Sequence, residues 1–155
     1  MKIVTNLNQV TAKLVTKLKS ISDINGEARD MMLRQVASDT AAKVTYRIHT
    51  QGLKSDGTPM GKYNNSYLKL RESKYNRTSD PKVILSLTGQ MENDFGIVAN
   101  KTNQYGLGFK NSFNAEKAEW AEDKYGKVYN LTKEEEANAG LIANDFIAEY
   151  LNEAD

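Results

Sequence analysis

Four carboxylates in one short stretch are the first residues whose types and spacing could do chemistry: Glu116, Glu119, Glu122 and Asp123. On a helix, spacings of three and four bring side chains to one face. Carboxylates paired there can act as general acid and base or bind a divalent cation. A solvated acidic helix face has the same spacing, and no histidine lies nearby to complete a site. We therefore expect no catalytic residue and no metal site, and we rank a carboxylate hydrolase last among the possible functions.

Nucleophilic and metal chemistry is further limited by the residue counts. The chain has one histidine, His49, and no cysteine. Thiol nucleophiles, disulfides and Cys-ligated metals are therefore excluded, and a Ser-His-Asp triad would depend on that single imidazole. The segment 57–62 also lacks the length and the second hydroxyl residue of a phosphate-binding loop. We expect a protein that is not an enzyme and that uses no cofactor.

Basic and aromatic residues are interleaved between Lys43 and Lys82. This segment has nine Lys and Arg against three Asp and Glu, together with four tyrosines. Basic groups beside aromatic rings bind phosphates and stack bases, but Tyr and Arg are also enriched at protein interfaces. No signature of a sequence-specific nucleic-acid-binding domain accompanies them. We interpret the segment first as a protein interface and keep non-specific DNA binding as the alternative.

The net charge of +1 hides two halves of opposite sign. Residues 1–87 have fifteen Lys and Arg against seven Asp and Glu, whereas residues 88–155 have six against thirteen. The halves either mix their charges on one surface or form complementary faces through which copies meet head to tail. In the second case, the expected contact residues are Tyr63, Tyr67, Lys69 and Arg71 on the basic side, and Phe109, Glu119, Trp120 and Glu122 on the acidic side.

The elements that must position these residues begin with two helices. Apolar residues recur every three or four positions over 6–21, and the same period continues through 27–48 after a turn at 22–26. Residues 49–66 are rich in glycine and poor in apolar groups, so we expect an irregular loop or arm. Residues 66–77 predict a short helix, and 83–87 predict a buried strand or a turn into the core.

The second half of the chain predicts a hairpin and two helices. Residues 94–100 and 105–110 alternate as antiparallel strands, and Gly106 and Gly108 leave the second strand bare enough for a neighbouring helix or chain to approach closely. Asn114 is the expected N-cap of a helix over 115–124. Thr132 opens a capping box before a C-terminal helix over 133–152. We expect one α+β domain over 1–155, with long helices packed on a small antiparallel sheet and an extended interface loop.

The order of several short motifs resembles a known family. A long helix is followed by DGTPMGKY (56–63), SYLKLR (66–71), VILSLTGQM (83–91), a hairpin, and KAEWAEDKYG with NLTKEEE (117–136). The most specific piece is Ile84-Leu85-x-x-Thr88-Gly89-x-Met91. This order resembles the virion-morphogenesis or tail-completion proteins of tailed bacteriophages, the Mu-like minor structural proteins of the head-tail connector.

The resemblance implies an α+β structural subunit that assembles as a ring at the head-tail junction of a virion, without catalysis. Its partners would be copies of itself and adjacent neck, portal or tail proteins, with non-specific contact to packaged DNA as a further possibility. Assembly would take place in the host cytoplasm, and the mature location would be the virion. No apolar run of about 18 residues and no signal segment occurs, so we expect no membrane partner.

Overall fold

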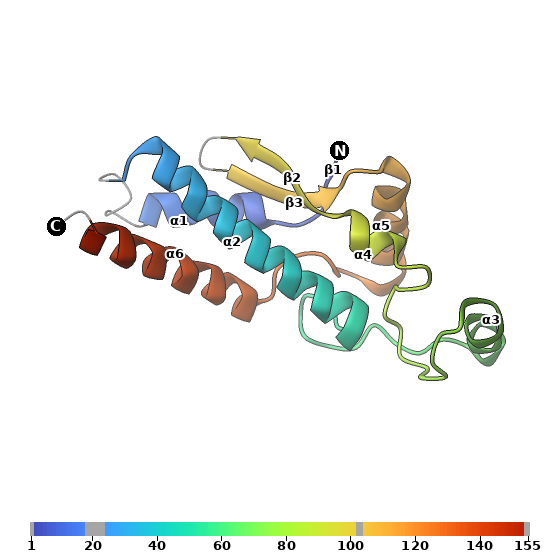
Figure 1. Cartoon of the computed structure of the whole chain (residues 1–155). Coiled ribbons are helices and arrows are strands. Elements are labelled where there is room, and N and C mark those ends of the chain that lie inside the picture. The colour runs from blue at the N-terminus through green and yellow to red at the C-terminus, as the bar shows by residue number, and fades with distance from the viewer. Residues whose placement is uncertain (1, 18–23, 102–103, 154–155) are drawn as a thin grey trace.

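The computed structural model describes residues 2–17, 24–101 and 104–153, and within them it is an α+β fold. A three-stranded antiparallel sheet, ordered β1-β3-β2, lies over the helices (Figure 1). The helix α1 (Leu7–Lys17) packs under β3. The long helix α2 (Gly26–Tyr46) packs against β2 and β3 and also against the long helix α6 (Lys133–Glu153), which lies farther from the sheet (Figure 1). The expected fold class is confirmed.

The helix α2 forms where the apolar period predicts it. The Asn25 side chain accepts a hydrogen bond of 2.8 Å from the Ala28 amide and caps the N-terminus. Buried residues such as Met32, Val36 and Val44 follow at helical spacing. The helix continues as a π-helical turn, Arg47–Gln51, which ends at Gly52 with φ of +69°. This extra turn removes three residues from the loop that was expected to begin at residue 49.

The hairpin consists of β2 (Phe95–Lys101) and β3 (Gln104–Phe109), close to the expected strands. A third strand, β1 (Lys2–Ile3), pairs with β3 in register Lys2 to Phe109 and Ile3 to Gly108. Two residues are too few to show a periodic pattern, so the sequence did not predict β1. A close approach over the glycines was expected from a neighbouring helix or chain. At Gly108 the approaching segment is instead the strand β1, since a Cβ there would collide with the Lys2 carbonyl oxygen.

A projecting arm carries the helix α3 (Asn65–Tyr75) away from the sheet and the long helices (Figure 1). Its two extended segments are joined by a bridge between Lys62 and Lys82, and the Val83 amide donates to the Gly61 carbonyl at 3.0 Å. The Asn64 side chain caps α3 by accepting from the Tyr67 amide at 2.8 Å. The irregular segment thus ends at Asn64, and residues 83–87 form no strand, although Val83 is buried.

Three further elements complete the chain: α4 (Gln90–Asp94), α5 (Ser112–Tyr125) and the C-terminal α6. Asn111, rather than Asn114, caps α5 by accepting from the Phe113 amide at 2.9 Å. Asn114 is instead buried and donates to Asp94 at 3.0 Å. The expected capping box of α6 is present. The sequence did not predict α4, and the expected first-helix end and turn over 18–23 lie outside the described residues.

The core lies between α2, α6 and the sheet. It includes Leu33 and Ile48 from the α2 segment, Leu107 and Phe109 from β3, and Tyr129 from the segment before α6. Phe95, Phe109 and Tyr129 pack with ring centroids 5.4 to 6.0 Å apart. None of the described helices is long and apolar enough to cross a lipid bilayer.

Candidate functional site: a cationic and aromatic cleft

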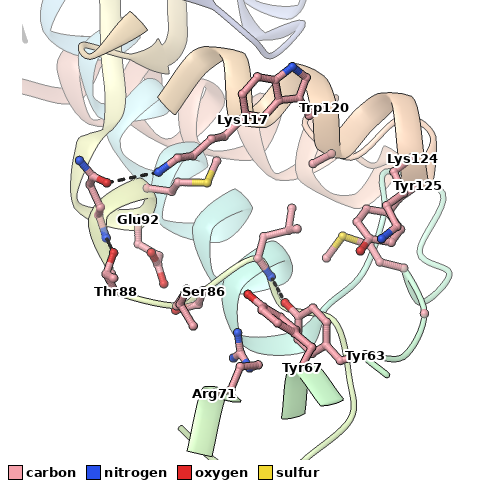
Figure 2. A pocket seen from close by; sticks show the side chains of 18 of the residues that line it. Tyr63, Tyr67, Arg71, Ser86, Thr88, Glu92, Lys117, Trp120, Lys124 and Tyr125 are labelled. Carbon is pink, nitrogen blue, oxygen red and sulfur yellow. Dashed lines mark hydrogen bonds between the residues drawn. The ribbon is translucent and has the colours of Figure 1, made fainter. Parts of the chain in front are cut away.

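An open cavity of about 860 Å³ lies between the arm, the segment before α4, and α5 (Figure 2). Tyr63, Tyr67 and Arg71 line it from the arm, and Trp120 lines it from α5. From the sequence, the first three were expected on one copy of the chain and Trp120 on a second copy. The fold instead brings all four to the walls of one cleft within a single chain.

Arg71 is the most unusual residue of the cleft because it is a cation with only 3% of its surface exposed. Its guanidinium carbon lies 4.6 Å from the ring centroid of Tyr63 and 5.7 Å from that of Tyr67. The two rings meet edge to face at 5.0 Å. The Arg71 Nε is buried and finds no hydrogen-bond acceptor among the described residues. The aromatic faces attract the cation, but they do not replace a hydrogen-bonding anion.

Tyr63 joins the arm to the wall of the cleft. Its hydroxyl oxygen accepts hydrogen bonds from the Ile84 amide at 3.3 Å and from the Leu85 amide at 3.2 Å. Burial raises the pKa of the Tyr63 hydroxyl above its ordinary value, so this oxygen stays protonated at neutral pH. Leu85 has a left-handed backbone with φ of +48°, which is rare for a leucine. The two hydrogen bonds to Tyr63 help to hold this strained turn.

His49 supports the same wall from behind. Its Nδ1 lies 3.2 Å from both the Ile84 and the Leu85 carbonyl oxygens, so Nδ1 carries the proton and donates. Its Nε2 and the Glu92 Oε2 are buried without a hydrogen-bond partner among the described residues. Burial lowers the pKa of His49, and the negative charge of Glu92 opposes that shift only in part. No spacing pattern in the sequence links His49 with Glu92, so neither residue was expected at the site.

The α5 side of the cleft is exposed. Trp120 has 58% of its surface open to solvent and Phe113 has 50%, and their rings meet edge to face at 6.2 Å. The Lys117 Nζ lies 4.7 Å from the Phe113 ring centroid. It also donates to Gln90 Oε1 at 3.3 Å, the dashed line from Lys117 in Figure 2. Lys124, two turns after Lys117 on α5, also lines the cavity. A large exposed aromatic beside lysines is typical of a surface that binds a partner.

The other expected contact residues have different places. Phe109 is fully buried in the core, which corrects its expected role as an interface anchor. Alternation along β3 turns its side chain inward rather than toward a neighbour. Lys69 is exposed on α3, outside the residues that line the cleft.

Two of the expected acidic contact residues already have partners within the chain. Glu119 forms an ion pair with Lys2. Glu122 accepts from the Val128 and Tyr129 amides, both at 3.0 Å, and pairs with Lys127 at 3.5 Å. These contacts orient the segment after α5, so the acidic face of that helix is partly used by its own fold.

The charge of the cleft is mainly positive. Its charged lining residues are Lys62, Arg71, Lys117, Lys124 and the single carboxylate Glu92. Over the described ranges, no group of three or more His, Asp or Glu side chains is placed to hold a metal ion. The arrangement fits an anionic group with an apolar neighbour.

Comparison with family models, with curated proteins and with solved structures found no match for this chain.

Proposed function

We propose that this protein is a structural subunit of a bacteriophage virion at the head-tail junction. It would act as a neck or tail-completion ring protein that works by self-assembly and by docking to neighbouring virion proteins. The observation that carries the proposal is the open cleft, which is lined by the buried cation of Arg71 on a projecting arm and, on its α5 wall, by the exposed Trp120 (Figure 2).

The composition of the cleft supports a protein partner. Trp, Tyr and Arg are the residues most enriched among those that dominate binding free energy at protein interfaces. Here Tyr63, Tyr67, Arg71 and Trp120 surround one cavity, and Phe113 extends the aromatic surface beyond its rim. An arm that leaves the rest of the chain also offers surface to a neighbour, as expected for a subunit that interlocks with others.

The motif behind the family resemblance supports the same proposal. Its residues Leu85, Thr88, Gly89 and Met91 all line the cleft. Gly89 is the N-cap residue of α4 and has φ of +81°. This position therefore has a left-handed backbone conformation, which residues other than glycine rarely adopt. The part of the chain that most resembles the phage proteins is therefore the part that shapes the candidate binding surface.

Electron microscopy and light scattering of the purified protein test the proposal, together with mass spectrometry of intact particles. We expect rings in solution and the protein at the head-tail junction of the particle. Replacing Trp120 and Phe113 together by alanine should shift the oligomers toward monomers, because the substitutions remove two exposed aromatic side chains from the proposed interface. Tyr46→Ala, which truncates an aromatic residue on α2 that is 56% exposed, serves as the control. A monodisperse monomer that is absent from particles would refute the proposal.

Non-specific DNA binding is the second candidate. It is favoured by the exposed Lys69 and Lys74 on α3, at the tip of the arm. Titration with duplex DNA across a salt series separates the two functions. Micromolar binding near physiological ionic strength, with a steep loss at higher salt, would favour this candidate. Lys69→Gln with Lys74→Gln should then weaken binding equally for all sequences.

A further inference from the structure

Among the described residues, the buried cation of Arg71 has no counter-ion. No ion pair between them includes it, and its buried Nε has no hydrogen-bond acceptor among those residues. Taking a charge out of water is unfavourable unless an opposite charge and hydrogen-bond acceptors replace the water. Buried polar groups without partners are few in folded proteins, and each calls for an explanation. Because Arg71 lines an open cleft, a group that enters the cleft can supply the missing acceptor.

The neighbouring residues indicate which group this is. A carboxylate matches the planar fork of a guanidinium and accepts two parallel hydrogen bonds from it. Lys117 and Lys124 on the opposite wall add positive charge, while Met91, Tyr67 and Trp120 provide apolar surface. The cleft therefore suits an acidic segment that also carries an apolar side chain.

Such a segment exists on the outer face of α6. Leu141 has 61% of its surface exposed, and Asp145 and Glu149 are also exposed. The spacing of four residues brings these three side chains to one stripe of the helix. Neither carboxylate forms an ion pair or a hydrogen bond with a described residue.

The position of the stripe excludes a contact within one chain. The helix α6 runs away from the arm, and its C-terminal half lies at the opposite end of the molecule from α3 (Figure 1). A contact between cleft and stripe must then join two copies. Because the two surfaces differ, each copy can bind one neighbour through its cleft and another through its α6. Such a head-to-tail contact generates a ring when the rotation between neighbours closes.

We propose that the cleft of one copy binds the α6 stripe of a second copy, with the carboxylate of Asp145 or Glu149 on Arg71 and Leu141 against Trp120. This inference rests on the self-assembly in the proposed function and names the two surfaces that meet. It also replaces the acidic face of α5, considered from the sequence, with that of α6.

Sedimentation velocity over a concentration series at low salt tests the contact. Arg71→Gln in the cleft, and Asp145→Lys with Glu149→Lys in the stripe, should each weaken self-association at least tenfold, because each removes one side of a charge pair. Exchanging the charges, with Arg71→Glu and Asp145→Arg in one chain, should restore part of the lost association. The single tryptophan, Trp120, should shift its emission to shorter wavelength as copies associate.

Two further variants control for folding and for total charge. Lys117→Glu with Lys124→Glu changes only the α5 wall of the cleft and should weaken association without disturbing Arg71. Glu116→Lys with Asp123→Lys makes the same change of charge as the stripe variant, but on α5. This variant should not show the tenfold loss of self-association. Circular dichroism of every variant should match the unmodified protein.

The outcomes separate the two proposals. Rings that persist in the cleft and stripe variants, or that are lost only in the Glu116 and Asp123 variant, overturn this inference and leave the proposed function standing. An unmodified protein that stays monomeric at all concentrations overturns both. Duplex DNA that binds with micromolar affinity and loses that affinity in Arg71→Gln would show that phosphate, rather than a carboxylate, occupies the cleft.

Discussion

The Arg47 guanidinium and the Glu135 carboxylate form a two-pronged ion pair in the core, although 88 positions separate them in the chain. Arg47 Nε donates to Glu135 Oε1 at 2.7 Å, and Nη2 donates to Oε2 at 3.2 Å. Arg47 Nη1 also donates to the Val128 carbonyl at 2.8 Å. Glu135 completes the capping box by accepting from the Thr132 amide at 2.8 Å. This pair therefore ties the end of α2 to the start of α6.

Replacing Arg47 by methionine should lower the free energy of unfolding by about 3–5 kcal/mol, because the Glu135 charge stays buried without its partner. Urea unfolding followed by circular dichroism measures this change. Lys43→Met, one turn earlier and exposed, should change stability by less than about 1 kcal/mol. Equal effects of the two substitutions would show that the pair does not hold the helices together.

The protonation of His49 should make stability depend on pH. Burial lowers its pKa in the folded state, so the unfolded chain takes up a proton first as the pH falls below about 6.5. The stabilisation is complete above that pH and is lost as the pH falls toward the lowered pKa. We expect a loss of up to about 1.4 kcal/mol between pH 7.5 and 5.5 by urea unfolding.

The matched variant is His49→Asn, whose amide keeps a donor but does not titrate. Because the chain has no second histidine, this variant should show a nearly flat stability over the same pH range. An unchanged slope in His49→Asn would place the titrating group elsewhere.

The glycines of β3 predict a graded series of alanine substitutions. Gly108→Ala should destabilise the protein by more than about 2 kcal/mol, because its Cβ would meet the backbone of Lys2. Gly106→Ala should cost less, since its Cβ would lie 2.6 Å from the movable end of the Ile3 side chain. Gly96→Ala, with nothing within 4 Å of the added Cβ, is the control. Thermal unfolding should rank the three in this order, and a reversal would contradict the pairing of β1 with β3.

Removing the Tyr63 hydroxyl should loosen the wall of the cleft. Tyr63→Phe leaves the Ile84 and Leu85 amides without their acceptor, which costs about 1–3 kcal/mol where those groups are buried. Hydrogen exchange at these two amides should become faster. Tyr67→Phe, whose hydroxyl accepts no hydrogen bond from a described residue, should leave both rates unchanged. Slow exchange in both variants would mean that other contacts hold the turn.

Sequence reasoning located the long helices, the hairpin and the capping box because each has a local signal. Each of these signals involves positions only a few residues apart: the apolar period of α2, the alternation in β3, and the pair Thr132 and Glu135. The strand β1 and the helix α4 have two and five residues, too short for any period to emerge. The partners of Asn114 and Arg47 lie 20 and 88 positions away, which no local pattern reveals.

The candidate site was predicted in part. The interleaved tyrosines and arginines marked Tyr63, Tyr67 and Arg71, and Trp120 stood out as the only tryptophan. Their meeting in one cleft depends on the path of the arm, which glycine-rich composition does not define. Phe109 was misplaced because alternation along a strand shows two faces without showing which one is buried.

The bridge between Lys62 and Lys82 brings the chain back to the point where it left, so residues 64–80 form a closed excursion. None of these residues belongs to the buried core. Doubling the length of such a closed excursion adds only about 0.6 kcal/mol of closure entropy. The tip of the arm is thus a suitable insertion point, where a reporter domain or an affinity handle should leave the sheet and the long helices intact.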